Sequence, residues 1–329
     1  MSADLRAPLV GLHLSAEEHR PDVLVASARR AEEAGFAFVT VSDHFQPWTR
    51  RQGQSPFVWT VLGAIAQVTD RVGVGTAVTC PTVRLHPAIV AHAAATAAAM
   101  LPGRFFLGVG TGERLNECVL GDRWPSAAVR RQMLEEAVGI IRALWTGDVV
   151  RAHRGRHYTV EHARLFTRPA TPPPIVVSGL GPRSAALAGR IGDGYMHVSP
   201  EAELVEAFRA AGGHGKPCYG KLDACVAADD AQARKIAHEV WPTSGLGGEL
   251  GQQLPTPEHY EQATATVRED DVAASILCSA DPERHIAALR EFADAGFDHV
   301  LVQQSGPDQE RLIALYADRI LPRLGAARA

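Results

Sequence analysis

The sequence has few of the features that mark secreted, membrane-spanning and nucleic-acid-binding proteins. Its five cysteines are odd in number and form no Cys-x-x-Cys pair, so neither a disulfide framework nor a zinc site is indicated. No stretch approaches the roughly 18 apolar residues of a membrane helix, and the N-terminal residues lack the apolar core of a signal peptide. The 37 acids and 33 bases give a net charge of −4, which creates no positive field for nucleic acid or an anionic membrane. We therefore expect a cytoplasmic protein with no nucleic-acid or membrane partner.

Two common cofactor signatures are also missing. No early Gly-x-Gly-x-x-Gly is followed by an acid about 20 residues later, which argues against a dinucleotide-binding fold. The 14 histidines include His153 and His157, four positions apart, but this segment has neither helical patterning nor partner carboxylates. We therefore expect no metal.

The sequence does contain a repeated alternation of apolar strands and helices. Hydrophobic residues make up 46% of its 329 positions, enough to bury a large core. Strands are expected at 8–14, 36–41, 72–80, 105–109, 175–178, 194–198, 222–227 and 299–303, and the clearest helices at 21–34, 56–68, 87–100, 127–145, 281–295 and 308–320. Eight strands alternating with helices indicate an α/β fold, the (β/α)₈ or TIM barrel.

Two segments interrupt this alternation. Residues 147–174 are rich in His and Arg and end in a proline run, which indicates an excursion with a hairpin near 157–160. Residues 241–257 are rich in Gly and Pro and are expected to form a loop over one mouth of the barrel. Since such barrels have about 250 residues plus insertions, a single domain over 1–329 is expected.

Ionisable and small polar residues follow the ends of several expected strands. The strand ends of a barrel point to one mouth, so these residues meet there. The set is Glu17, Asp43, His44, Trp48, Cys80, Glu113, Asn116, Ser178, Gly179 and His197. His44 and Glu113 are suited to accept and donate protons on opposite sides of a substrate. The alternative is that Asp43 caps the next element, His44 is an ordinary polar residue at a strand end and Glu113 only begins a helix.

Two glycine-containing segments suit a phosphate or a flat ligand. Gly108, Gly110 and Gly112, at alternate positions, allow close approach of the backbone, although strand glycines also mark tight packing. Residues 179–183, Gly-Leu-Gly-Pro-Arg, lie between a strand and a helix start. Such a loop is similar to the phosphate site of later loops in these barrels.

Several motifs, in order and spacing, resemble the coenzyme F420-dependent branch of the luciferase-like oxidoreductases, most closely the F420-dependent glucose-6-phosphate dehydrogenases. The match is most specific around His44. The matching segments are 15–17, 40–48, 75–76 with 81–82, 106–113 with 116–117, and 189–194. The resemblance implies a barrel of the bacterial luciferase-like type with loop insertions, coenzyme F420 as cofactor, and a homodimer.

The same resemblance implies roles for residues of the mouth. His44 would remove the substrate hydroxyl proton, and Glu113 would act as the acid near the deazaflavin. Trp48 and Glu17 would shape the cavity, and Asp43 would contact the deazaflavin.

The resemblance also implies which residues surround the cofactor. The peptide bond between Ala77 and Val78 would be cis, behind the ring. Cys80, where the family has a threonine, would lie near the ring. The other implied contacts are Gly110, Thr111, Gly112 and Asn116 along the cofactor, and Ser178, Gly179, Leu180 and Gly181 at its phosphate.

Three positions depart from the sugar-phosphate dehydrogenases of the family. Glu201 and Gln262 stand where lysines are expected, and small residues near Ser275 replace a basic residue. A sugar phosphate would thereby lose charge-assisted partners worth about 1.5–3 kcal/mol each. With His197, Glu201 and Gln262 on the substrate side, we expect a sugar-like substrate other than glucose 6-phosphate, such as an amino sugar or aminoglycoside.

The expected enzyme moves a hydride between deazaflavin C5 and a carbinol carbon, as a dehydrogenase, a reductase or a redox epimerase. An FMN-dependent luciferase-like monooxygenase is one alternative, disfavoured because oxygen activation does not need the set of Asp43, His44, Trp48 and Glu113. A catalytically silent deazaflavin-binding protein is the other. The intact His44 and Glu113 argue against it.

Overall fold

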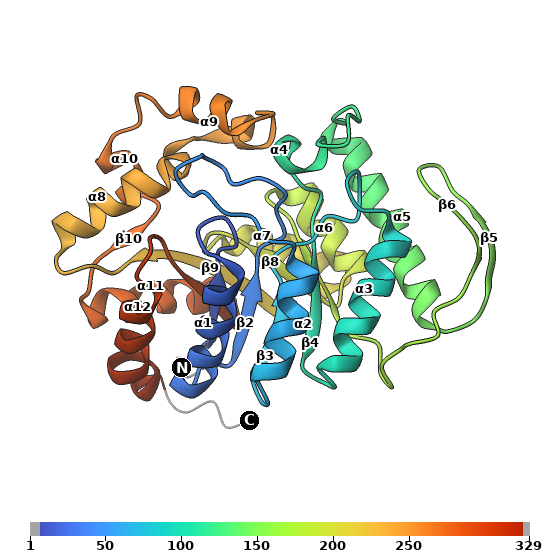
Figure 1. Ribbon diagram of the computed structural model, residues 1–329, viewed down its shortest axis with the longest axis horizontal. Helices are drawn as coiled ribbons and strands as arrows, with labels where there is room; N and C mark the ends of the chain where they lie inside the picture. The colour runs from blue at the N-terminus through green and yellow to red at the C-terminus, as the bar shows by residue number, and fades with distance from the viewer. Residues whose placement is uncertain (1–6, 325–329) are drawn as a thin grey trace.

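Residues 7–324 are described by the computed structural model, and their strands close into a barrel at the centre of the molecule (Figure 1). The eight barrel strands are β1 (Leu9–Leu14), β2 (Phe38–Val41), β3 (Gly73–Thr76), β4 (Phe105–Val109), β7 (Ile175–Ser178), β8 (Gly194–His197), β9 (Cys218–Cys225) and β11 (His299–Gln304). Each is parallel to the next along the chain, and β11 pairs with β1 to close the ring. The expected (β/α)₈ barrel is confirmed.

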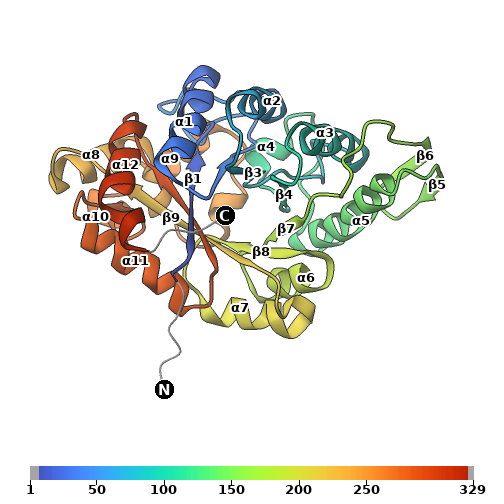
Figure 2. The same cartoon turned by 90° about the horizontal axis from the view of Figure 1, so that it is seen from below.

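Helices cover the outside of the barrel, as Figure 2 shows. The main ones are α1 (Pro21–Ala34), α2 (Val58–Val68), α3 (Pro87–Met100), α5 (Ala127–Trp145), α6 (Pro182–Ile191), α7 (Ala202–Phe208), α8 (Asp230–Val240), α11 (Pro282–Asp294) and α12 (Gln309–Leu315). Local signals set their ends. Pro21 begins α1, because its missing N–H is not needed there, and Gly35 ends it with φ 89°.

Apolar side chains pack on both faces of the barrel strands. Between strands and helices, residues such as Leu12, Val39 and Leu134 are fully buried. Inside the barrel lies a second cluster, made of Phe38, Phe106, Val176, Met196, Tyr219 and Leu301. Because strand side chains alternate between faces, residues two positions further along these strands point into the carboxyl-end mouth.

The segment 147–174 forms an antiparallel hairpin of β5 (Val150–Arg154) and β6 (Thr159–Ala163), outside the barrel beside α5 (Figure 1). Glu136 of α5 holds it. Its carboxylate accepts hydrogen bonds from the backbone N–H groups of His157 and Tyr158 and contacts His153 Nε2 at 3.0 Å. The two histidines singled out in the sequence thus lie at a structural junction.

The chain between β9 and β11 is the longest insertion. It contains α8, α9 (Pro257–Ala263), α10 (Glu269–Ala273) and the short strand β10 (Leu277–Cys278), and residues 242–252 form two 3₁₀ turns. The expected start of the seventh strand, at Leu222, was wrong. The observed strand, β9, begins at Cys218 and includes Gly220, which resembles a turn residue in the sequence but pairs with both β8 and β11. No helix of residues 7–324 is long and apolar enough to span a membrane.

Candidate active site

The imidazole of His44 lies between two carboxylates at the carboxyl-end mouth. Glu17 follows β1, His44 follows β2, and Glu113 precedes the short helix α4 (Arg114–Glu117) after β4. His44 Nδ1 is 3.0 Å from Glu17 Oε1, and His44 Nε2 is 3.8 Å from Glu113 Oε1. The contact between His44 and Glu17 is an ion pair, because its geometry does not meet that of a hydrogen bond. The barrel therefore brings together three of the residues selected from the sequence.

The position of Glu17 is fixed by its neighbours. The hydroxyl groups of Ser15 and Ser42 donate hydrogen bonds of 2.8 and 2.7 Å to its Oε2, which leaves Oε1 facing His44. The Ser42 Oγ also accepts from the backbone N–H of Ala16. The β1 and β2 loops are thus joined through this carboxylate.

Electrostatics make His44 and Glu17 an ionised pair. Burial lowers the pKa of His44, but the negative charges of Glu17 and Glu113 outweigh it and raise this pKa to about 9. Burial raises the pKa of Glu17, whereas the charge of His44 and the hydrogen bond from Ser42 hold it well below its usual range. At neutral pH, His44 carries a proton that it can donate.

Asn116 orients the acid on the other side of His44. Its Nδ2 donates to Glu113 Oε1 at 2.6 Å, and its Oδ1 accepts from the backbone N–H groups of Phe45 and Gln46. The expected contact of Asn116 with a cofactor stays a prediction. What the geometry shows is that this amide ties the loop after His44 to α4.

Asp43 belongs to a buried ionic chain with Arg84 and Glu117. Arg84 Nη2 donates to Asp43 Oδ1 at 2.9 Å, and Arg84 Nε lies 3.6 Å from Glu117 Oε1. Thr79 Oγ1 donates to the other oxygen of Asp43. Both carboxylate oxygens of Asp43 are therefore engaged within the protein, and its direct contact with a deazaflavin stays a prediction. Burial raises the pKa of Glu117 to about 7.

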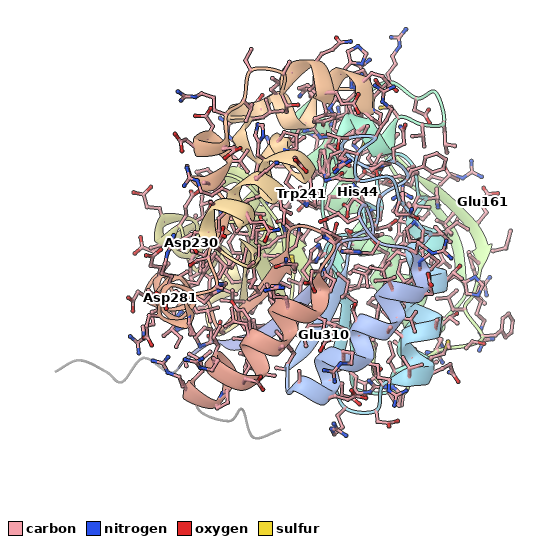
Figure 3. The ribbon with its side chains drawn as sticks, turned by 60° about the vertical axis from the view of Figure 1, so that its left-hand side comes forward. His44, Glu161, Asp230, Trp241, Asp281 and Glu310 are labelled. Atoms are coloured by element: carbon pink, nitrogen blue, oxygen red, sulfur yellow. The ribbon has the colours of Figure 1, made fainter. Side chains whose placement is uncertain are left out.

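Aromatic rings form a wall beside His44. The Trp48 ring meets the His44 ring edge-on, with centroids 5.0 Å apart, and the Tyr260 ring of α9 at 5.3 Å. Trp48 also packs against a buried cluster that contains Trp241. Figure 3 labels His44 and Trp241 close together, and the contacts agree: Trp241 Nε1 donates to Glu18, while His44 pairs with Glu17.

Gly108 of β4 and Gly110 after it form a wall of small side chains that leaves no room for a Cβ atom. A Cβ atom added to Gly108 would lie 1.9 Å from the Thr76 carbonyl oxygen, and one added to Gly110 would lie 2.7 Å from Val78 Cγ2. The peptide bond between Ala77 and Val78 is cis, as expected. Only glycine therefore fits at 108 and 110, and the expected contact of this wall with a flat cofactor stays a prediction.

The loop after β7 leads into a helix start that can receive a phosphate. Gly181 is the N-cap of α6, no side chain of residues 7–324 caps this helix, and the space beside Gly181 is open. Helix N-termini attract anions through their N–H groups and dipole. The expected contacts of Ser178, Gly179, Leu180 and Gly181 with the cofactor phosphate stay predictions.

The three residues expected at the substrate differ in accessibility. His197 is buried, and its ring contacts the Gly179 carbonyl oxygen at 3.0 Å and Ser199 Oγ at 3.0 Å. Glu201 is 55% exposed and accepts a hydrogen bond from Ser199. Gln262 is exposed on α9. None of the three is placed against His44, so their substrate contacts stay predictions.

Sequence reasoning missed Arg84, Trp241 and Tyr260. A single arginine in an irregular loop has no periodic pattern, and the two aromatics lie in or near the Gly- and Pro-rich insertion. The only usable signal was the position of Arg84 shortly after the third strand end. Within residues 7–324, no group of three or more His, Cys, Asp or Glu side chains could hold a metal ion.

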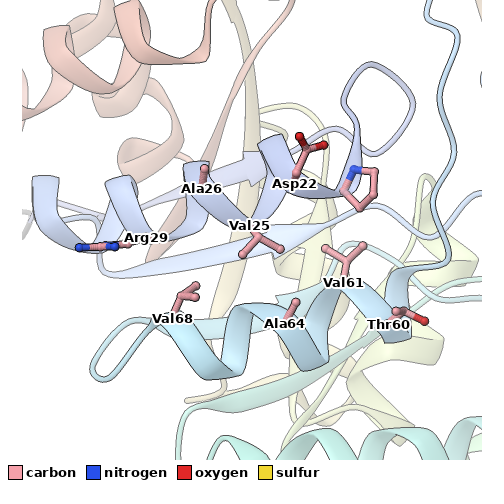
Figure 4. A pocket seen from close by; sticks show the side chains of 9 residues that line it. Asp22, Val25, Ala26, Arg29, Thr60, Val61, Ala64 and Val68 are labelled. Carbon is pink, nitrogen blue, oxygen red and sulfur yellow. The ribbon is translucent and has the colours of Figure 1, made fainter.

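Two cavities lie outside the His44 cluster. One of about 590 Å³ is lined by Gln46, Leu115, Trp124, Gln253 and neighbouring residues beside α4. The other, of about 490 Å³, lies between α1 and α2 and has an almost wholly apolar lining that includes Val25, Val61, Ala64 and Val68 (Figure 4). Neither contains His44 or Glu113.

One protein family and several known proteins match nearly the whole chain. The family model described as luciferase-like monooxygenase matches residues 8–299. The F420-dependent glucose-6-phosphate dehydrogenase of Nakamurella multipartita is 37% identical over 327 residues, covering 96% of each protein. The F420-dependent hydroxymycolic acid dehydrogenase of Mycobacterium tuberculosis is 39% identical over 329 residues, covering 96% of this chain and 88% of that protein.

A similar solved structure is also that of an F420-dependent dehydrogenase. An F420-dependent secondary alcohol dehydrogenase, in complex with an F420-acetone adduct, is 32% identical and superposes with a TM-score of 0.89. The match covers 98% of this chain and 100% of the other. The resemblance seen in the motifs is confirmed, and the chain belongs to the luciferase-like monooxygenase family.

Proposed function

We propose that this protein is a coenzyme F420-dependent oxidoreductase that acts on a CH–OH group. The observation that carries the proposal is the arrangement of Glu17, His44 and Glu113 at the carboxyl-end mouth of the barrel. Three similar proteins, which match along nearly the whole chain, are named as F420-dependent dehydrogenases. Bound coenzyme F420 supplies hydride acceptance or donation at C5 of its deazaflavin. The protein manages the protons and the geometry.

His44 is the proposed proton carrier for the substrate oxygen. Oxidation of an alcohol needs a neutral imidazole that accepts the hydroxyl proton, and reduction of a ketone needs the imidazolium that donates it. Because Glu17 and Glu113 raise the His44 pKa to about 9, the donating form dominates at neutral pH. The resting charge state therefore favours reduction.

Glu113 and Trp48 complete the proposed reaction site. Glu113 is held by Asn116 and lies 3.8 Å from His44 Nε2, so one substrate oxygen beside them can contact both groups. The side chains of His44 and Glu113 are only 13% and 15% exposed, which restricts water near the reacting atoms. Trp48 closes the site on the side of α9.

Residues of β4, β7 and the α6 start are the proposed holders of the cofactor. Gly110 and Ser178 present backbone and a short side chain to the ring, and the α6 N-terminus with Arg183 receives the phosphate. Titration of the purified protein with F420 and with FMN tests this assignment. We expect tight binding of F420 and weak binding of FMN, and equal affinity would contradict it.

The proposed substrate is sugar-like and not glucose 6-phosphate. Glu201, whose pKa is lowered by the Ser199 hydrogen bond, and Gln262 would offer a phosphate no fixed cation. A carboxylate at position 201 favours an ammonium instead, as in an amino sugar. Turnover of glucose, glucose 6-phosphate and an aminoglycoside, by wild type and Glu201→Lys, tests this. A wild-type preference for glucose 6-phosphate would contradict it.

We also propose a cytoplasmic homodimer. Helices α2 and α3 contain no charged side chain, and Phe57, Ile89 and Met100 are exposed at 52%, 60% and 38%. All five cysteines are free thiols, in keeping with a reducing compartment. Light scattering of wild type and Ile89→Glu tests the dimer. A monomeric wild type, or a variant with unchanged mass, would contradict this interface.

A further inference from the structure

One half of the barrel mouth carries a layer of polar side chains that the proposed reaction does not use. The inner cluster includes Phe38, Tyr219 and Leu301, with Leu9 of β1 packed against it. Counting onward in steps of two along the strands reaches Thr40, His13, Gln303 and the pair Lys221 and Asp223. These side chains therefore face the barrel interior, on the carboxyl-end side of the inner apolar cluster.

Strand register places four of them side by side. In the pairing of β2, β1, β11 and β9, the residues aligned at one level are Thr40, His13, Gln303 and Asp223. We call these four residues the polar row. His13 Nδ1 is 2.9 Å from Thr40 Oγ1, whereas Gln303 Nε2, in a residue only 1% exposed, has no hydrogen-bond partner among residues 7–324.

Lys221 lies next to the polar row, two residues before Asp223 on the same face of β9. Its Nζ lies 2.5 Å from Asp223 Oδ1, and the side chains of the two residues are 18% and 24% exposed. The sequence has three lysines, at positions 216, 221 and 235. Of these, Lys221 lies on the interior face of a barrel strand. The pair is neutral as a whole but presents N–H donors and carboxylate acceptors to the mouth.

The polar row lies next to the proposed reaction site. Lys221 Nζ is 5.9 Å from the centre of the Trp241 ring, and Trp48 packs against the cluster that contains Trp241. His13 is close enough to Glu17 and His44 for their charges to act on it. A molecule bound against His44 and Trp48 can therefore extend to Lys221 and Asp223.

We propose that the polar row and Lys221 bind hydroxyl groups of a polyhydroxylated substrate, such as a sugar or cyclitol. The inference rests on the proposed function and names its substrate class. A hydroxyl both donates and accepts, so it can bridge Lys221 Nζ and Asp223 Oδ, and a further oxygen can accept from Gln303 Nε2. A phosphate finds no uncompensated cation here. A hydrocarbon chain would cover the Lys221–Asp223 pair and leave Gln303 Nε2 without a partner.

The test compares polyols with a simple secondary alcohol. Wild type loaded with F420 is given glucose, myo-inositol, sorbitol and 2-propanol, and the same series is run with the double variant Lys221→Met/Asp223→Leu. Removing both members of the pair leaves no unpaired buried charge, which favours a folded protein. Lys235→Met, on the exposed face of α8, is the matched control.

At least one polyol should exceed 2-propanol in wild-type kcat/KM. In the double variant that polyol should lose about 10²-fold or more, since two charge-assisted hydrogen bonds are removed. The value for 2-propanol should stay within about threefold, as should the F420 dissociation constant. The control variant should match wild type.

Two results would overturn the inference: a wild-type preference for 2-propanol over all three polyols, or equal losses for polyol and 2-propanol. If no alcohol reduces F420 in the wild type, the proposed function fails. Binding of polyols to the polar row is then measured without turnover. Tryptophan fluorescence titration with the same polyols should show binding that the double variant loses and Lys235→Met keeps. Absence of that difference also overturns the inference.

Discussion

Glu17 Oε1 and His44 Nδ1 meet at 3.0 Å although they belong to loops after different strands. The pair is held by Ser15 and Ser42 from the same two loops. Neither loop could place the imidazole alone. The ion pair fixes which nitrogen faces the substrate, because Nδ1 is turned to Glu17 and Nε2 to Glu113.

The charge of Glu17 should set the pH dependence of turnover. Alcohol oxidation needs neutral His44, so its kcat/KM should rise with pH and level off above the His44 pKa, raised to about 9 by Glu17 and Glu113. Ketone reduction needs the imidazolium and should fall through the same value. Glu17→Gln should move both profiles down by about one unit or more. Profiles measured in both directions check this, and an unmoved midpoint in Glu17→Gln would refute the coupling.

Loss of the imidazole should affect chemistry and not cofactor binding. His44→Ala is expected to lower kcat by roughly 10²–10⁴-fold while the F420 dissociation constant stays nearly unchanged. Single-turnover kinetics with a deuterated substrate would show whether hydride transfer limits the rate. Wild-type turnover in the variant, with hydride transfer limiting, would mean that another group carries the proton.

A methyl group on the small-residue wall should interfere with the cofactor. The Cβ of Gly110→Ala would lie 2.7 Å from Val78 Cγ2, so that side chain or the backbone of this wall would have to shift. We expect about tenfold or greater loss of F420 affinity, a misplacement effect of the kind seen in preorganised sites. Gly139→Ala on α5, where nothing lies within 4 Å, is the control and should leave affinity intact. Equal affinities in fluorescence titration would exclude this wall as the cofactor site.

Arg84 should be essential to stability because it neutralises two buried acids. Arg84→Met leaves Asp43 and Glu117 without their cation, and breaking such a buried network typically costs about 3–5 kcal/mol. Urea unfolding measures the loss. Arg29→Met, which breaks only an exposed pair with Glu33, should change stability by about 0.5 kcal/mol or less. Similar values for both variants would show that the buried chain is not needed for folding.

The fold and the His44 cluster were predictable because each depends on a regular pattern. Apolar runs alternating with helices predicted the eight strands, and barrel geometry then predicted that Glu17, His44 and Glu113 would meet. The identity of the neighbours was not predictable. Arg84 acts through contacts to Asp43 and Glu117 that no local spacing encodes.

Lys221 shows how a small boundary error hides a residue. With the seventh strand expected from Leu222, Lys221 lay outside the expected strand and had no assigned face. The observed strand starts at Cys218, which places Lys221 and Asp223 on the interior face. Trp241 was hidden for another reason: it begins an irregular segment, and its position depends on Glu18 from the other end of the chain.

Hydride transfer between a carbinol carbon and F420 within this site can be measured directly. The experiment uses a secondary alcohol deuterated at the carbinol carbon, with the enzyme and oxidised F420 under anaerobic conditions. We expect loss of the oxidised deazaflavin absorbance, one deuterium at C5 of the reduced cofactor, and one equivalent of ketone. No deuterium at C5, together with FMN-dependent oxygen consumption by the same protein, would contradict it.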